Sequence, residues 1–186
     1  MNSFARRGYV VISIDYRKRT IDGTAGQPSD AAVRDTYEDA SAAIKWILDH
    51  AAEYRIDPNA IVTAGWSAGA ITSMNLAYWD EPDGEFDPGE HIVAAAAVGG
   101  FLWPGGGEID TGEPPAVLIQ GKADGIVPWP LATRTCELAD GADVDCTVSV
   151  IEGGSHWPGT NAEVEQFLSD FFLSNGLAER GYCGVV

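Results

Sequence analysis

Short apolar runs alternate along this chain with segments of helical period. Five runs have the composition of strands that are covered on both faces: "YVVISIDY" (Tyr9–Tyr16), "AIVTAG" (60–65), "HIVAAAAVGGF" (91–101), "AVLIQG" (116–121) and "VDCTVSVIEGG" (144–154). Strands that alternate with helices predict an α/β fold, with a mostly parallel sheet and helices on both of its faces. The length of 186 residues predicts a single domain over residues 1–186, and the connection from Trp103 to Pro115, between the third and fourth predicted strands, is too short for a cap domain.

The longest predicted helix begins with Asp30 as its N-cap and ends before "RIDPN". Its apolar residues recur at intervals of three and four: Val33, Tyr37, Ala40, Ile44, Ile47 and Ala51. Further helices are expected from Ser67 to about Trp79, at Leu131–Leu138, and from a capping box of Thr160 and Glu163 to near Gly176.

The junction "GWSAG" places Ser67 between two glycines, where a predicted strand runs into a predicted helix. A serine hydroxyl is a poor nucleophile unless it is exposed, has a base within reach and faces donors for the oxyanion. A tight strand-to-helix turn would expose Ser67, and Gly65 and Gly69 would keep the crowded turn free of side chains. The N–H of Ala68, at the helix start, would point to the developing negative charge.

Two further residues follow later strands in a way that suits this serine. Asp124 follows the fourth strand, in "QGKADGIVPW", and His156 follows the fifth, in "EGGSHWP". Taken alone, Asp124 reads as a turn residue before a glycine and His156 as a surface histidine. The carboxyl ends of parallel strands meet at one edge of a sheet, so the joint pattern predicts a Ser67–His156–Asp124 triad. The other histidines, His50 and His91, follow no predicted strand.

These motifs resemble the α/β-hydrolase esterases of the carboxylesterase type, including relatives of hormone-sensitive lipase and bacterial feruloyl esterases. The resemblance rests on "FARRGYVVISIDYR", "GWSAGA", "QGKADGIVP" and "GGSH", and covers most of residues 4–173. It implies that Ser67 is the nucleophile, His156 the general base and then acid, and Asp124 the carboxylate that orients the histidine. Gln120 stands where the family usually has a histidine, and we expect this change to leave catalysis unaffected.

The front of the chain departs from that family. Family members usually carry two or three strands and a His-Gly-Gly loop before the segment that begins here at Phe4. One of those strands lies between the counterparts of Tyr9–Tyr16 and of the strand leading to Ser67. In this N-terminally shortened version the two segments would pair directly, leave a gap, or borrow a strand from another chain, so a homodimer is one expectation.

The absent loop would supply further oxyanion donors, and a lost donor lowers turnover by about 10²–10³. We therefore expect a weak enzyme. The glycine-rich "PGGGE" (104–108) is a candidate source of substitute N–H donors.

The leading functional hypothesis is a serine carboxylic-ester hydrolase that acts on short-chain acyl or aryl esters through an acyl-enzyme, with no cofactor and no metal. The alternatives are a peptidase of the prolyl oligopeptidase type, or a non-catalytic or incomplete hydrolase fragment. Four tryptophans near strand ends are candidates for an aromatic substrate pocket, although at least two of them are expected to serve only packing: Trp66, Trp103, Trp129 and Trp157.

Charge limits the choice of partners. The chain has 28 acidic and 11 basic side chains, a formal net charge of −17. Such a chain repels nucleic acid and anionic membranes, which argues against binding either. The acidity fits either a salt-rich habitat or an ordinary acidic surface. The sequence shows neither a membrane span nor a signal peptide, so this chain reads as a soluble, cytoplasmic protein, or a secreted one if its N-terminus is truncated.

Two smaller features stay open at this level. Cys136 and Cys146 flank a turn-like segment and could form a disulfide or remain free thiols, with Cys183 left over. The acidic stretch "DEPDGEFDPGEH" (80–91) lacks the ligand spacing of an EF-hand, so we expect a solvated loop rather than a calcium site.

Overall fold

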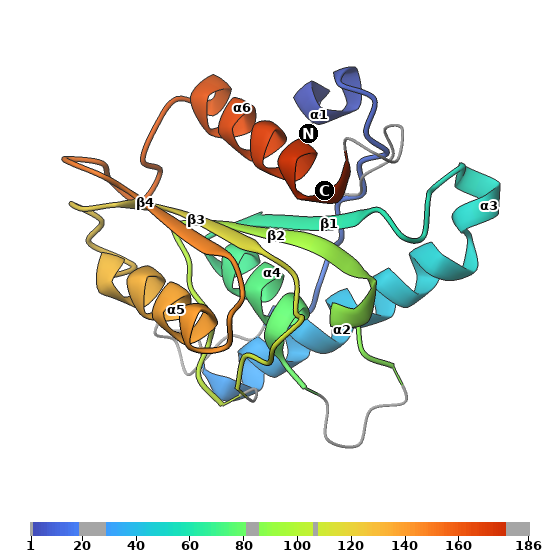
Figure 1. Ribbon diagram of the computed structural model, residues 1–186, viewed down its shortest axis with the longest axis horizontal. Coiled ribbons are helices and arrows are strands. Elements are labelled where there is room, and N and C mark those ends of the chain that lie inside the picture. The colour runs from blue at the N-terminus through green and yellow to red at the C-terminus, as the bar shows by residue number, and fades with distance from the viewer. Residues whose placement is uncertain (1, 19–28, 81–85, 106–107, 178–186) are drawn as a thin grey trace.

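The computed structural model describes residues 2–18, 29–80, 86–105 and 108–177. Its sheet has four parallel strands in the order β1-β2-β3-β4: Ile61–Trp66, Ile92–Val98, Ala116–Gly121 and Cys146–Ile151 (Figure 1). All four apolar runs that supply these strands were predicted as strands. The predicted α/β class, with a parallel sheet, is confirmed.

Helices cover both faces of this sheet. They are α1 (Asn2–Arg6), α2 (Asp30–Asp49), α3 (Ala51–Tyr54), α4 (Ala68–Tyr78), α5 (Trp129–Gly141) and α6 (Asn161–Phe172), with a 3₁₀ turn at Gly89–His91 and a π-helical turn at Leu173–Leu177. Figure 1 shows α1 and α6 on one face and α2, α4 and α5 on the other. Within the described residues, no helix has both the length and the apolar composition that a membrane crossing requires.

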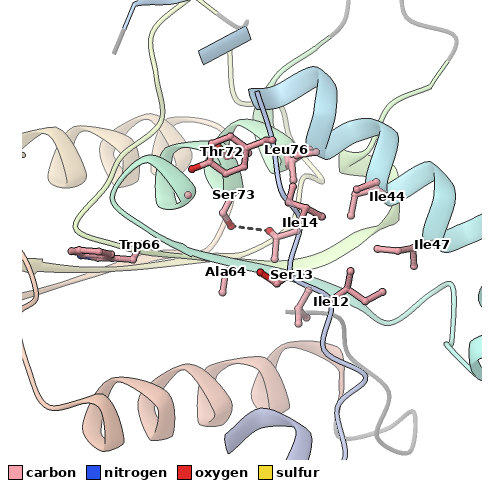
Figure 2. Close-up of a pocket in the computed structure, with 16 residues that line it drawn as sticks. Ile12, Ser13, Ile14, Ile44, Ile47, Ala64, Trp66, Thr72, Ser73 and Leu76 are labelled. Atoms are coloured by element: carbon pink, nitrogen blue, oxygen red, sulfur yellow. Dashed lines mark hydrogen bonds between the residues drawn. The ribbon is translucent and has the colours of Figure 1, made fainter. Parts of the chain in front are cut away.

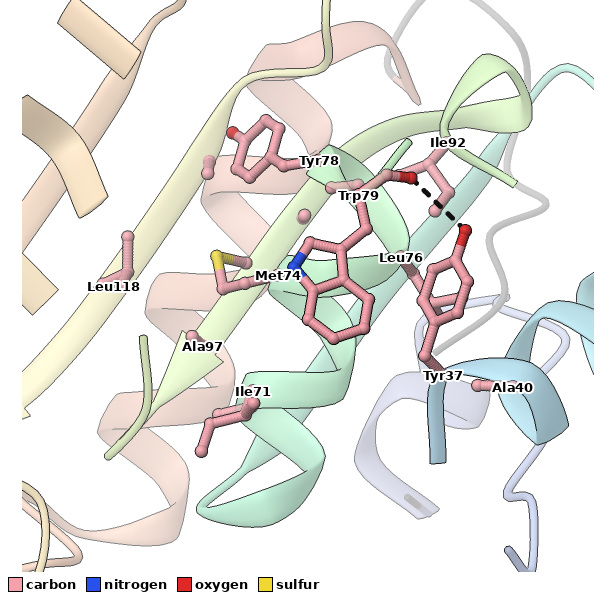
Figure 3. Close-up of a cluster of buried hydrophobic side chains, with 14 of the residues drawn as sticks. Tyr37, Ala40, Ile71, Met74, Leu76, Tyr78, Trp79, Ile92, Ala97 and Leu118 are labelled. Carbon is pink, nitrogen blue, oxygen red and sulfur yellow. Dashed lines mark hydrogen bonds between the residues drawn. The ribbon is translucent and has the colours of Figure 1, made fainter. Parts of the chain in front are cut away.

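The larger hydrophobic cluster lies between the sheet and the helices α2, α4 and α5. The apolar stripe predicted on α2 is buried in it at every position: Val33, Tyr37, Ala40, Ile44, Ile47 and, at the start of α3, Ala51. Figure 3 shows α4 as its centre, with the Tyr37 hydroxyl donating to the carbonyl oxygen of Trp79 at 3.3 Å. The predicted N-cap of α2 is wrong by one residue, because the hydroxyl of Ser29 accepts the N–H of Ala32.

A second cluster lies on the opposite face, under α6. Val164, Leu168 and Phe172 pack there against Val117 and Val62 of the sheet. The predicted capping box is present, since the Thr160 hydroxyl accepts the Glu163 N–H and the Glu163 carboxylate accepts the Thr160 N–H. Helical structure then continues to Leu177, one residue past the predicted end.

The predicted strand at Tyr9–Tyr16 is not formed. The segment is extended, and its side chains alternate as in a strand, with Val10, Ile12 and Ile14 packed on the larger cluster and Val11 on the second. It passes from α1 on one face of the sheet to α2 on the other, strongly inclined to β1 (Figure 1). Within the described part of the chain, no backbone hydrogen bond joins Val10–Tyr16 to another segment. The expected direct pairing with β1 is therefore absent within the described residues, while a strand borrowed from another chain stays a prediction.

The structure decides between a disulfide and free thiols for Cys136 and Cys146, because both residues are described. Cys136 on α5 and Cys146 at the start of β4 form a disulfide with a Cα–Cα distance of 5.0 Å. Cys183 lies outside the described residues, as does the 81–85 part of the acidic stretch. Among the residues that are described, no three metal-ligating side chains gather into a cluster.

Candidate active site

Ser67 occupies the bend between β1 and α4. Its φ of 57° and ψ of −119° lie in a region that a residue with a side chain rarely adopts. Backbone hydrogen bonds hold this conformation, because the Ser67 N–H donates to Val98 O at 2.9 Å and Ser67 O accepts from the N–H groups of Ala70 and Ile71. The predicted strand–serine–helix junction is therefore present.

Of the two glycines that flank Ser67, only one occupies a position with no room for a side chain. A Cβ on Gly65 would lie 2.1 Å from the carbonyl carbon and oxygen of Gly69, so any side chain there would push β1 away from α4. A Cβ on Gly69 would meet nothing within 4 Å. The expectation that both glycines relieve crowding is thus wrong for Gly69.

The three residues predicted to form the triad lie in hydrogen-bond contact. His156 Nε2 is 2.9 Å from Ser67 Oγ, and His156 Nδ1 is 2.8 Å from Asp124 Oδ2. An ionised carboxylate only accepts hydrogen bonds, so the network assigns the ring proton to Nδ1 and leaves Nε2 to accept from the serine hydroxyl. This is the arrangement in which an imidazole can take the serine proton.

The Asp124 side chain is fully buried, yet it is held as a carboxylate. Burial by itself would raise the pKa of Asp124. Hydrogen bonds from His156 and from the N–H groups of Ile126 and Val127, at 2.8 and 3.0 Å to Oδ1, outweigh burial and lower that pKa below its ordinary value. An ionised carboxylate in this position can orient His156 and stabilise its protonated form.

Gln120 contacts this carboxylate, which the sequence analysis did not anticipate. Its fully buried Nε2 donates to Asp124 Oδ2 at 2.8 Å and to Val127 O at 2.9 Å. The Oδ2 atom that receives the Gln120 hydrogen bond is the one that faces His156. The expectation that Gln120 leaves catalysis unaffected stays a prediction, but the residue is in direct contact with the triad carboxylate. The sequence did carry one signal of this contact, because Gln120 lies four residues before Asp124, at the end of the same strand.

The loop that carries His156 is held in place by two residues outside the triad. Gly99 follows β2 with φ of +63°, and a Cβ on it would lie 2.9 Å from His156 O and 3.3 Å from the imidazole ring. From β1, the Trp66 indole N–H donates to the same His156 carbonyl at 3.0 Å. The backbone of His156 is thus fixed by the ends of two neighbouring strands.

The four tryptophans separate into two pairs. Trp66 lies beside His156, with ring centroids 5.2 Å apart, and makes an edge contact with Trp157. Trp103 packs against the larger cluster and its indole N–H donates to Asp30. No hydrogen bond or ring contact within the described residues links Trp103 or Trp129 to the triad. The structure therefore places Trp66 and Trp157 at the site, and within the described residues it shows no such contact for Trp103 and Trp129.

The start of α4 offers a backbone donor next to the serine. Ala68 is the first residue of the helix and is exposed, and within the described residues no acceptor takes its N–H. The Ala68 N–H is therefore available for the predicted role of oxyanion donor, which stays a prediction. Of the second candidate source, "PGGGE", residues 106–107 lie outside the described residues.

An apolar groove of about 650 Å³ runs beside β1. Figure 2 shows that residues of β1, α2, α4 and the extended segment surround it, with Trp66 at one end. None of Ser67, Asp124 and His156 lines this groove, so it is distinct from the space in front of the triad.

The chain is similar to known esterases. The sequence profile of the BD-FAE family matches residues 1–92. The chain is 27% identical over 146 residues to Esterase LipI of Mycobacterium tuberculosis (strain ATCC 25618 / H37Rv), a match that covers 66% of this chain and 43% of that protein.

Solved structures show the same fold. Thermogutta terrifontis esterase 2 phosphorylated by paraoxon superposes with a TM-score of 0.63 at 25% identity, over 77% of this chain and 65% of that one. A truncated carbohydrate esterase from gut microbiota superposes with a TM-score of 0.58 at 20% identity, over 78% of this chain and 68% of the other. The chain thus spans less than half of LipI and about two thirds of the structural neighbours. It has the α/β-hydrolase fold and resembles the esterases of that superfamily.

Proposed function

We propose that the protein is a serine carboxylic-ester hydrolase. Ser67 Oγ attacks the ester carbonyl while His156 Nε2 takes the hydroxyl proton, and Asp124 stabilises the imidazolium that forms. The Ala68 N–H donates to the oxyanion. The tetrahedral intermediate collapses to an acyl-enzyme as His156 returns the proton to the leaving alcohol. Water, deprotonated by His156, then releases the acid and restores Ser67.

One structural observation is the main support for this proposal. The imidazole of His156 bridges a serine at a strained bend and a buried carboxylate, with both contacts below 3 Å. The peptidase alternative shares this triad, so only the substrate distinguishes it. The aromatic rings of Trp66 and Trp157 beside His156 favour short acyl or aryl groups. Within the described residues the candidate oxyanion donor is the Ala68 N–H, and for a site with this donor alone we expect low turnover.

The test is a series of p-nitrophenyl esters of increasing acyl length, with aminoacyl p-nitroanilides beside them. We expect hydrolysis of the short esters, with an initial burst of p-nitrophenol equal to the enzyme concentration when deacylation is slow. Ser67→Ala should abolish both, whereas Ser155→Ala, which changes an exposed serine next to His156, should keep them. Turnover of the anilides alone would favour the peptidase, and no turnover of either class would favour a non-catalytic fragment.

A covalent test does not depend on turnover. The esterase of Thermogutta terrifontis is phosphorylated by paraoxon. If Ser67 is activated here, its Oγ should displace p-nitrophenolate from paraoxon, and mass spectrometry should find one diethylphosphoryl group on the peptide that contains Ser67. Unmodified wild-type protein, or equal modification of Ser67→Ala, would contradict the proposal.

A further inference from the structure

The residues of the proposed triad come from two parts of the sheet. Asp124 follows β3 and His156 follows β4. Backbone hydrogen bonds join their loops, because the N–H groups of Lys122 and Ala123 each donate at 2.9 Å to a carbonyl oxygen at or just beyond the end of β4. Ser67 follows β1, and β2 lies between β1 and β3. The acid and the base therefore form one unit, while the serine belongs to another.

Trp66 links these two units next to the reacting atoms. It directly precedes Ser67, and its indole N–H donates to the carbonyl oxygen of His156 at 3.0 Å. Consecutive residues at the end of β1 thus contact the same histidine, since Ser67 Oγ lies 2.9 Å from His156 Nε2. Among the described residues, no other side-chain hydrogen bond joins β1 or α4 to the loops that follow β3 and β4.

The Trp66 indole makes further contacts with the loop that carries His156. Its ring lies 5.2 Å from the imidazole, measured between centroids, and meets the ring of Trp157 edge to face at 5.7 Å. The backbone of Gly99 approaches the same carbonyl group, because a Cβ there would lie 2.9 Å from His156 O. The backbone of His156 is therefore held by contacts that do not involve Ser67 Oγ.

The hydrogen bond between Ser67 and His156 exists in only part of the proposed reaction cycle. In the free enzyme the serine hydroxyl donates to Nε2. In the acyl-enzyme the same Oγ is an ester oxygen and has no proton to donate. The imidazole is then held by Asp124 at Nδ1 and by its contacts with Trp66. Nε2 must nevertheless stay in place, because it has to take a proton from the attacking water.

We propose that Trp66 is a positioning residue for deacylation, whose indole keeps His156 in place while Ser67 carries the acyl group. This inference rests on the proposed function. In that step the water oxygen bonds to the acyl carbon and gives a proton to His156 Nε2. The proton then passes to Ser67 Oγ as the bond between Oγ and the acyl carbon breaks. A base displaced by about 1 Å can lower the rate by about 10². During acylation Ser67 Oγ itself holds the imidazole, so Trp66 matters less in that step.

The test separates the two steps in a single turnover, with enzyme in excess over p-nitrophenyl acetate. Release of p-nitrophenolate measures acylation, and rapid-quench mass spectrometry of the acetylated protein measures deacylation. Trp66→Phe keeps an aromatic ring and removes the N–H donor. We expect its deacylation rate constant to fall about three- to tenfold, the effect of one neutral hydrogen bond, and its acylation rate constant to stay within about twofold. Trp66→Leu, which also removes the ring, should slow deacylation further.

Steady-state kinetics provides a second readout. Once deacylation limits turnover, kcat and KM of Trp66→Phe should fall together, so that kcat/KM stays within about twofold of the wild type. Its kcat should also be the same for p-nitrophenyl acetate and phenyl acetate, because both form the same acetyl-enzyme. Trp46→Phe is the matched control. Trp46 is exposed on α2 and its ring contacts His50 and Tyr54, so both rate constants should stay at the wild-type values.

The possible failures are distinguishable. Equal slowing of both steps, or an unchanged deacylation rate constant in both Trp66 variants, would overturn this inference and leave the proposed function standing, because acetyl-enzyme still forms. A wild-type protein that never carries an acetyl group on Ser67 would overturn the proposed function, and this inference with it.

Discussion

At the scale of single residues, the candidate site depends on contacts that converge on His156 and Asp124. Asp124 Oδ1 accepts two backbone N–H groups, and Oδ2 accepts from His156 and from Gln120. In the proposed mechanism Gln120 touches no atom that reacts, so we expect it to act as a positioning residue that orients Asp124 and, through it, His156.

Replacement of this donor should reduce catalysis without affecting binding. In Gln120→Met we expect kcat to fall about tenfold with KM unchanged, because a hydrogen bond to a charged acceptor contributes about 1.5–3 kcal/mol and the remaining donors compensate in part. Gln120→His, which keeps a donor, should restore most of the activity. Steady-state kinetics on a p-nitrophenyl ester checks this, with the exposed Gln166→Met as control. An unchanged kcat in Gln120→Met would remove the positioning role.

Gly99 offers a second test at this scale. In Gly99→Ala the new methyl would press on the His156 backbone and ring, and a displacement of about 1 Å at a catalytic group can cost about 10² in rate. We therefore expect kcat/KM to fall about 10²-fold.

Gly112→Ala is the matched control for backbone strain. Gly112 also has a positive φ, +99°, but its Cβ would meet nothing within 4 Å. It should lose about 1 kcal/mol of stability and keep its activity. Equal kinetics in the two variants would show that the approach of Gly99 to His156 is not what matters.

At the scale of elements, a covalent link ties α5 to the edge strand β4. The Cys136–Cys146 disulfide closes a loop with a sequence separation of 10. Because a cross-link of this length removes conformational entropy from the unfolded chain, we expect the double Cys→Ser variant to lose about 2–3 kcal/mol of unfolding free energy. Urea unfolding measures this loss.

Reduction provides the control for that prediction. Dithiothreitol should lower the unfolding midpoint of the wild type and leave the double variant unchanged. Since neither cysteine contacts the triad, ester hydrolysis at low temperature should stay within about twofold. A wild-type midpoint that is insensitive to reduction would contradict the prediction.

At the scale of the whole molecule, acidity makes stability depend on pH. Burial, followed by repulsion from Asp80, Asp110 and Asp87, raises the pKa of Glu113 to about 7, although the Asp110 N–H donates to it. The folded state thus holds this proton more tightly than the unfolded state. Its contribution to stability is full below the ordinary glutamate pKa of about 4.5 and is lost as pH rises through 7. Asp124, with its lowered pKa, acts in the opposite direction and only in the more acidic range.

Glu113→Gln should flatten this pH dependence. We expect the unfolding free energy of the wild type to fall by on the order of 1 kcal/mol more than that of the variant between pH 5 and pH 8, a figure reduced for solvent screening of a partly exposed carboxyl. Urea midpoints at several pH values measure the difference, with the exposed Glu137→Gln as control. Parallel curves for wild type and Glu113→Gln would contradict the assignment.

The local features were predictable from the sequence because their causes are local. A hydrophobic period defines the buried stripe of α2, a Thr-x-x-Glu spacing defines the capping box of α6, and a serine at a strand-to-helix junction defines the bend. The triad could be predicted as well, since residues that follow parallel strands meet at one edge of the sheet.

Tertiary structure alone decided the rest. Tyr9–Tyr16 has the composition of a strand, but a strand exists only where a neighbour pairs with its backbone, and within the described residues no segment pairs with the backbone of Val10–Tyr16. Likewise, no pattern in the sequence predicts that Gln120 donates to Asp124 Oδ2 or that His156 packs closely against Gly99. Such contacts depend on how separate strand ends pack. The sequence determined the elements and the chemistry they carry, while packing decided which edge stayed open and which side chains met.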